Sequence, residues 1–148
     1  MKTIALRFGD GFAPAGGTIN AHNEIIEKLG YVWYGKFGTA VSNKVARLIM
    51  DNPKPRVLLI HSGTSNRYWA YIDAISRIQP DKHEFPSYYR DKAGNIKTWL
   101  KIIGFERAES NIMSKLIVVS SGSTLAETSK HSMSPYFIID CKEVVTDD

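Results

Sequence analysis

Cysteine is almost absent from this chain, which has Cys141 alone in its 148 residues. A single thiol excludes an intrachain disulfide and any zinc site built on several cysteines. Long apolar runs are missing too: those at 57–60 and 116–119 stop after four residues, whereas a bilayer span needs roughly 20. Residues 1–8 contain no apolar segment of the kind found in a secretory signal. We therefore expect a cytoplasmic protein that makes no membrane contact.

The common catalytic and metal-binding motifs are also missing. Gly16-Gly17 is not followed by the Lys-Ser/Thr of a phosphate loop, and the Ser-rich segment 120–124 lacks the G-x-S-x-G pattern. No metal-ligand spacing relates the four histidines, which are His22, His61, His83 and His131. We interpret His22, on the apolar face of a predicted helix, as a core residue. The sequence thus predicts no catalytic residue, no metal and no cofactor.

Acidic residues are the minority among the charged ones. The chain has 19 Lys and Arg against 15 Asp and Glu, which gives a net charge of +4 and a pI near 9.2. This mild excess favours a polyanionic partner such as nucleic acid, but a solvated surface can carry the same charge.

Hydrophobic periodicity predicts an α+β domain. A helix is predicted from Thr18 or Asn20 to residue 29, and a second one is capped by Ser42 and closed by 52–55. Strands are predicted over 2–8, 31–37, 56–61, 67–75, 98–105, 116–120 and 136–140. The polar segment 80–95 is expected to be a functional loop. With no repeat and no long linker, residues 1–148 are expected to form a single domain, a small mixed β-barrel of five to seven strands flanked by helices.

Several short motifs follow one another in a distinctive order. Gly30-Tyr31-Val32-Trp33 precedes a helix with Ser42-Asn43-Lys44, and the hairpin 56–72 follows it. This order resembles the core of EVE and YTH domains, which belong to the PUA-like superfamily. The strand 98–105 and the segment 140–144 resemble the later parts of the same pattern, so the resemblance covers roughly residues 30–144. Residues 2–29 resemble the opening of EVE-like domains fused to McrB-type restriction ATPases, in which this module reads modified DNA.

The resemblance implies an aromatic cage for one nucleotide base. Trp33 occupies the position of the first wall of the cage, and the loop before Trp99 is where the second wall originates. That wall is usually a tryptophan, but no tryptophan lies between Trp69 and Trp99. Phe85, Tyr88 or Tyr89 is therefore the candidate.

Stacking on aromatic rings and contacts to phosphates define the candidate residues. A base between two rings gains about 1–3 kcal/mol per stack, and it has to be flipped out of a duplex to enter. The base-binding candidates are Trp33, Tyr34, Ser62, Asn66, Trp69, Phe85, Tyr88, Tyr89 and Trp99. The phosphate-binding candidates are Lys36, Lys44, Arg67, Arg90 and Lys92. The three tryptophans among them also fit plain core positions.

These observations lead to a hypothesis of a non-catalytic reader of a flipped, modified base. DNA is a better candidate than RNA, and the chain would serve as the specificity module of a modification-dependent restriction or defence system. Any nuclease or NTPase activity would then lie in an attached domain or in an AAA+ or nuclease partner. The alternatives are an ASCH-like enzyme that processes nucleotides or RNA, a protein that sequesters a small nucleotide, and a protein-interaction domain whose aromatics are all core.

Overall fold

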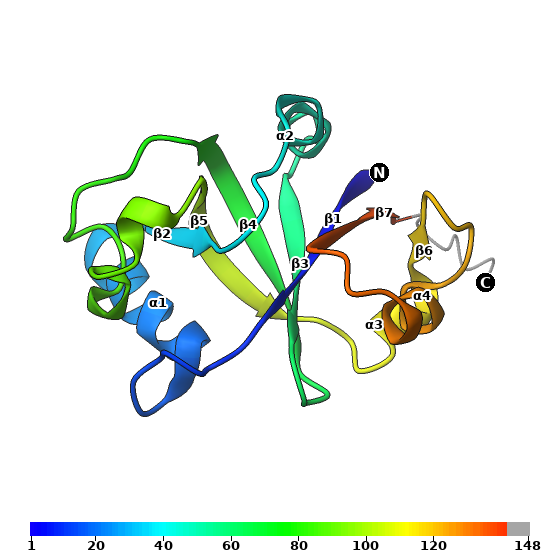
Figure 1. Ribbon diagram of the computed structural model, residues 1–148, viewed down its shortest axis with the longest axis horizontal. Coiled ribbons are helices and arrows are strands. Elements are labelled where there is room, and N and C mark those ends of the chain that lie inside the picture. The colour runs from blue at the N-terminus through cyan, green and yellow to red at the C-terminus, as the bar shows by residue number, and fades with distance from the viewer. Residues whose placement is uncertain (142–148) are drawn as a thin grey trace.

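Strands whose central members are buried on both faces form one mixed sheet in the computed structural model, which describes residues 1–141. The sheet has seven strands in the order β2-β5-β4-β3-β1-β7-β6. β1 pairs in parallel with β3, and the other neighbouring pairs are antiparallel. The sheet is strongly curved and barrel-like (Figure 1). Its strands are β1 (Lys2–Phe8), β2 (Val32–Lys36), β3 (Arg56–His61), β4 (Arg67–Ser76), β5 (Thr98–Arg107), β6 (Ile117–Val118) and β7 (Tyr136–Asp140).

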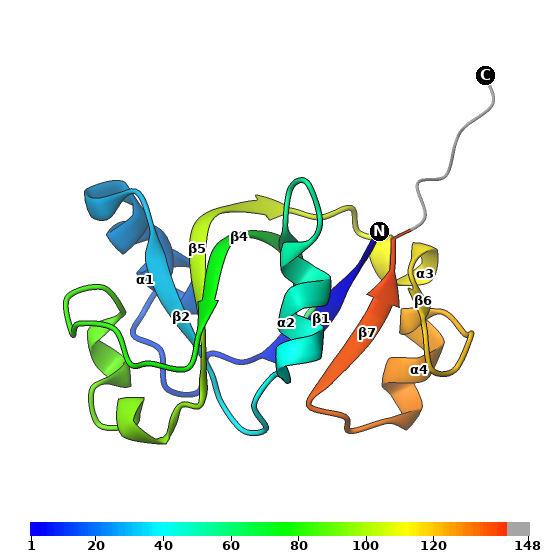
Figure 2. The same cartoon turned by 90° about the horizontal axis from the view of Figure 1, so that it is seen from above.

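Helices cover both faces of this sheet. α1 (Gly17–Leu29) packs against β2 and β5, and α2 (Asn43–Met50) lies across β1 and β4. α3 (Ile112–Lys115) and α4 (Leu125–His131) lie beside β6 at the other end of the molecule (Figures 1 and 2). The short 3-10 helices η1 (Ser87–Tyr89) and η2 (Ala93–Asn95) lie between β4 and β5 in the chain.

The alternation of β1 assigns its side chains to two separate cores. Ile4, Leu6 and Phe8 belong to the larger core, which α1 and α2 cover. Ala5 belongs to the second core, on the opposite face, which α3, α4 and β6 cover. Because successive residues of a strand point to opposite faces, a single strand supplies both cores. The predicted α+β, barrel-like fold with flanking helices is therefore confirmed.

The predicted ends of the helices are partly right. Ser42 caps α2, since its hydroxyl oxygen accepts a hydrogen bond from Val45 N at 3.2 Å. Gly30 ends α1 in the left-handed conformation, with φ of 83°. The predicted start of α1 at Thr18 or Asn20 is wrong, because the N-cap is Gly16 with φ of 103°. The capping carboxylate comes from outside the helix, where Asp10 Oδ1 accepts from Thr18 N at 2.9 Å.

The helices α3 and α4, near the C-terminus, were not predicted from the sequence. The Ser/Thr-rich segment 120–134 contains α4, which Thr124 caps by accepting from Glu127 N at 3.2 Å. The strand predicted over 116–120 is shorter, Ile117–Val118. Residues 142–144 of the family-like terminal segment lie outside the described residues. No helix within residues 1–141 has the length and apolarity that a membrane span requires.

Candidate functional site

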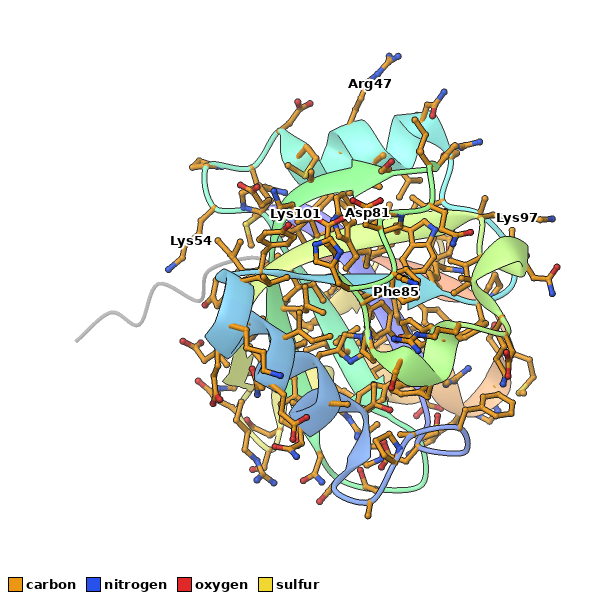
Figure 3. All side chains as sticks on the ribbon, turned by 90° about the vertical axis from the view of Figure 1, so that its left-hand side faces the viewer. Arg47, Lys54, Asp81, Phe85, Lys97 and Lys101 are labelled. Atoms are coloured by element: carbon orange, nitrogen blue, oxygen red, sulfur yellow. The ribbon has the colours of Figure 1, made fainter. Side chains whose placement is uncertain are left out.

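A cavity of about 310 Å³ opens where β1, β2, α1 and η1 meet. This volume is at the lower end of the range of small-molecule sites, so the cavity suits one planar group rather than an extended chain. Figure 3 faces the side of the molecule on which α1 and the η1 segment lie in front of the strands. The lining residues are Leu6, Arg7, Phe8, Gly9, Gly11, Phe12, Thr18, Tyr34, Lys36, Phe37, Tyr88, Tyr89 and Pro135.

Three tyrosines form the aromatic wall of the cavity. Tyr34 of β2 and Tyr89 of η1 are almost fully buried, and Tyr88 is half-buried. The rings of Tyr88 and Tyr89 meet edge to face, with centroids 4.7 Å apart. Burial raises the pKa of Tyr34 and of Tyr89 above the ordinary value, so both hydroxyls stay protonated at neutral pH.

The buried histidine behind this wall is neutral. His22 Nδ1 lies 2.8 Å from Thr18 O, so this nitrogen carries the proton and donates it. Nε2 is then free to accept from the hydroxyl of Tyr89 at 3.3 Å. Burial lowers the pKa of His22 to about 4. His22 is fully buried, as predicted for a core histidine, and it supports Tyr89 from behind.

The loop after β1 forms another side of the cavity and is held in place by charge. Phe8 stacks on His61 with ring centroids 4.8 Å apart and an interplanar angle of 9°. His61 Nε2 lies 2.8 Å from Asp10 Oδ2. The hydrogen bond from Thr18 N is the main reason why the pKa of Asp10 is lower than usual. The carboxylate therefore stays charged at the N-terminus of α1 and ties the loop to this helix.

The end of β1 lines the cavity together with Pro135, the residue that precedes β7. Phe8 O accepts from Ser62 N at 2.8 Å on the β3 side, so the neighbouring Arg7 turns its peptide groups toward β7. The register Leu6↔Tyr136 places Pro135 opposite Arg7, and proline has no N–H to donate. Pro135 therefore cannot donate to the carbonyl of Arg7, and both residues line the cavity.

Exposed aromatic rings and a lysine form the rim. Phe12 is 64% exposed and Phe37 is 45% exposed, and their ring centroids are 6.5 Å apart. Lys92 Nζ lies 4.1 Å from the centroid of the Phe12 ring. Phe12 and Phe37 also line the cavity, so apolar rings are exposed at its edge.

The structure divides the predicted base-binding residues into three groups. Tyr34, Tyr88 and Tyr89 line the cavity. Trp33 lies on the opposite face of β2 from Tyr34 and packs against a buried cluster instead, so the wall that β2 supplies is Tyr34 and not the predicted Trp33. This cluster, which we call the closed cluster, consists of Phe85, Tyr89, Ala93, Ile96 and Trp99.

The remaining base-binding candidates do not reach the cavity. Phe85 and Trp99 are buried in the closed cluster, with ring centroids 5.1 Å apart. Trp69 lies in the second core, where the guanidinium of Arg56 is 3.8 Å from its ring centroid. Ser62 and Asn66 belong to the turn between β3 and β4 and are not among the lining residues.

The predicted phosphate contacts are dispersed as well. Lys92 is at the rim, and Arg90 lines a neighbouring pocket that shares Tyr88 with the cavity. Lys44 is exposed on α2, and Arg67 is held by the carbonyls of its own turn, beside a separate pocket. Lys36 is inside the cavity and is 5% exposed.

Sequence reasoning missed the contribution of β1 and of the loop after it. Phe8, Phe12 and Pro135 all line the cavity, yet none belongs to a motif. An aromatic residue directly after a glycine-rich turn, as in Gly9-Asp10-Gly11-Phe12, was the one available signal for this side of the site.

One group of side chains within residues 1–141 has a geometry that suits a metal ion, namely Asp81, His83 and Glu84, whose ligand atoms lie within 4.8 Å of one another. Both carboxylate oxygens of Glu84 already accept hydrogen bonds. Oε1 accepts from the hydroxyl of Tyr31, and Oε2 accepts from Asp81 N at 3.0 Å. Glu84 O also accepts from Trp33 N at 2.8 Å, so this residue ties its loop to β2.

Comparisons with known proteins define the family. Searches among curated proteins and among solved structures returned no match. The family model described as Pua-like matches residues 4–148, nearly the whole chain. The chain therefore belongs to the PUA-like family.

Proposed function

We propose that this protein is a non-catalytic nucleic-acid reader that holds one flipped base in the tyrosine-walled cavity. Membership of the PUA-like family indicates a module that binds nucleic acid or another ligand. The observation that carries the finer proposal is the arrangement of Tyr34, Tyr88 and Tyr89 around a cavity of about 310 Å³.

Base stacking fits both the shape and the chemistry of this cavity. Each ring that stacks on a base contributes about 1–3 kcal/mol, whereas flipping a base out of a duplex costs a few kcal/mol. Two stacking contacts therefore offset the cost of flipping. The Arg7 carbonyl and the tyrosine hydroxyls supply polar groups for the edge of the base.

The rim favours a nucleic-acid strand over a free small nucleotide. Phe12 and Phe37 are exposed beside the opening, where they can stack on the nucleotide next to the flipped one. Lys92, over the Phe12 ring, lies where a phosphate of this neighbour would pass. A protein that sequesters a single nucleotide has no use for such a platform.

A modified DNA base is the ligand that the resemblance to EVE and YTH domains suggests, and the effector would then be an attached domain or a partner such as an AAA+ ATPase or nuclease. Burial of one methyl group contributes only about 0.8 kcal/mol. Selection of the modification would therefore rest mainly on hydrogen bonds to the edge of the base.

The test is a binding titration monitored by tryptophan fluorescence, since Trp33 packs against the same closed cluster as Tyr88. The ligands are single strands and duplexes with one central position that is a plain base, a methylated base or an abasic site. We expect the base-bearing strands to bind more tightly than the abasic strand. In Tyr88→Ala this advantage should fall by about 5- to 150-fold, the equivalent of one lost stack.

Tyr71→Ala is the matched control, because Tyr71 is a half-buried tyrosine that lines a different pocket. It should leave the advantage of the base-bearing strands unchanged. Equal binding of abasic and base-bearing strands by the wild type would refute the proposed function, and turnover of the nucleotide would support the ASCH-like alternative.

A further inference from the structure

The buried ammonium group of Lys36 is a feature of the cavity that stacking does not explain. Lys36 ends β2 and points to the same face as Val32 and Tyr34. It is 5% exposed, and lysine is rarely found at this depth unless it is paired. Among residues 1–141, no carboxylate forms an ion pair with it.

Backbone carbonyls hold this ammonium but do not exhaust its donors. Nζ donates to Thr39 O and, at 3.4 Å, to Phe37 O. The ring of Tyr136 lies beside it, with its centroid 5.4 Å from Nζ. An ammonium group has three N–H donors. One N–H is therefore left for a ligand in the cavity.

We propose that Lys36 is a specificity-determining residue that donates a hydrogen bond to an exocyclic oxygen of the bound base. This inference rests on the proposed function and names the class of base. Guanine, cytosine, thymine and uracil carry such an oxygen, whereas adenine has none and carries an amino group, a hydrogen-bond donor, where guanine has its oxygen. The cavity thus selects an oxo-base against adenine.

The position of Lys36 favours a base oxygen over a phosphate as the acceptor. A phosphate in a cavity walled by tyrosine and phenylalanine rings would have to lose its water shell, which is costly for a strongly hydrated ion. Phosphates of a bound strand stay in solvent at the rim, where Lys92 lies. A hydrogen bond from a charged donor is the stronger kind, so its loss is easy to measure.

The wild-type protein provides the first test, through pairs of purines in which one member carries an oxygen on C6 and the other does not. Oligonucleotides of abasic nucleotides with a single central base are compared: guanine with 2-aminopurine, and hypoxanthine with adenine. We expect the oxo-base of each pair to bind at least about tenfold more tightly. Burial lowers the pKa of Lys36, so the preference should fade with rising pH before an ordinary lysine loses its proton.

Lys36→Met removes the charge and keeps the length of the side chain. It should reduce the preference for oxo-bases to threefold or less and leave adenine binding nearly unchanged. Lys2→Met is the matched control. It removes an equal charge from an exposed position at the start of β1, and Lys2 does not line the cavity. Thermal melts of both variants show whether they are folded. If Lys36→Met does not fold, the comparison of the two purine pairs with wild-type protein tests the role of Lys36.

The possible outcomes separate this inference from the proposed function. The role of Lys36 is overturned if the wild type binds the two members of each purine pair equally, or if folded Lys36→Met keeps the preference for oxo-bases. Tyr88-dependent base binding stands in both cases. Lys36→Met could also lose the same affinity for base-bearing and fully abasic strands and show a smaller salt dependence of binding. This result would identify a phosphate contact, and it also overturns the role of Lys36 in base selection. Wild-type protein that does not distinguish base-bearing from abasic strands refutes the proposed function itself.

Discussion

The two faces of β2 show how one strand can support a closed core and an open site. On one face, Trp33 and Gly35 pack against the closed cluster, where a Cβ on Gly35 would come within 2.5 Å of Ile96 Cδ1. On the other face, Tyr34 and Lys36 line the cavity. The larger aromatic residue of the strand, Trp33, thus packs against the core, whereas Tyr34 and Lys36 lie at the cavity. The face on which a residue lies, and not the size of its ring, decides whether it lines the cavity.

The largest effect should come from breaking the closed cluster. Trp99 is fully buried in it, so Trp99→Ala should lower the free energy of unfolding by about 3–5 kcal/mol in urea titrations. Trp99→Phe should cost clearly less, because the indole N–H of Trp99 has no hydrogen-bond partner to lose. If Trp99→Phe were as damaging as Trp99→Ala, the ring volume would not be what the cluster requires.

A slightly smaller effect should come from protonation of the histidine behind the cavity. The pKa of His22 is about 4 in the folded protein and 6.5 in a model peptide. Between these values the unfolded chain binds the extra proton, so stability is complete above pH 6.5 and falls as the pH drops toward 4. The loss over this window should be roughly 3 kcal/mol.

His22→Gln isolates this contribution from that of the other titrating groups. The variant has no proton to gain, so its free energy of unfolding should vary less between pH 6.5 and pH 4 than that of the wild type. Denaturant titrations at several pH values measure both slopes. Equal slopes would show that His22 is not held neutral behind Tyr89.

The smallest effect should come from the rim. Phe12 is 64% exposed, so Phe12→Ser should leave the melting temperature within a few degrees of the wild type. It should nevertheless weaken the binding of strands with a base next to the target by about fivefold, and leave strands with an isolated target base unaffected. Equal weakening of both kinds of strand would assign Phe12 to the cavity rather than to the neighbouring nucleotide.

The fold could be predicted from the sequence largely because local signals agreed with one another. The alternation of β1, the Ser42 cap and Gly30 each specify a local conformation, and the structure confirms them. The start of α1 could not be predicted, because its capping carboxylate, Asp10, lies outside the helix and is brought in by the loop. α4 was not predicted because Ser and Thr usually favour turns, and Leu125 is the one residue of this helix that is buried in the core.

The residues that line the cavity could be predicted in part, for a related reason. The loop before β5 pointed to Tyr88 and Tyr89, which line the cavity. The choice between Trp33 and Tyr34 depended on which face of β2 is turned to α1, and this is decided by tertiary packing. Phe8 and Pro135 are 127 positions apart in the sequence, and only the pairing of β1 with β7 brings them to one cavity.

Isotope-edited NMR of the protein bound to a single-stranded oligonucleotide with one central base tests the central claim most directly. We predict nuclear Overhauser contacts between the base protons and the ring protons of Tyr34 and Tyr88, with none to Trp69 in the second core. Contacts confined to the sugars and to lysine side chains, with no tyrosine ring near the base, would contradict a base-holding cavity.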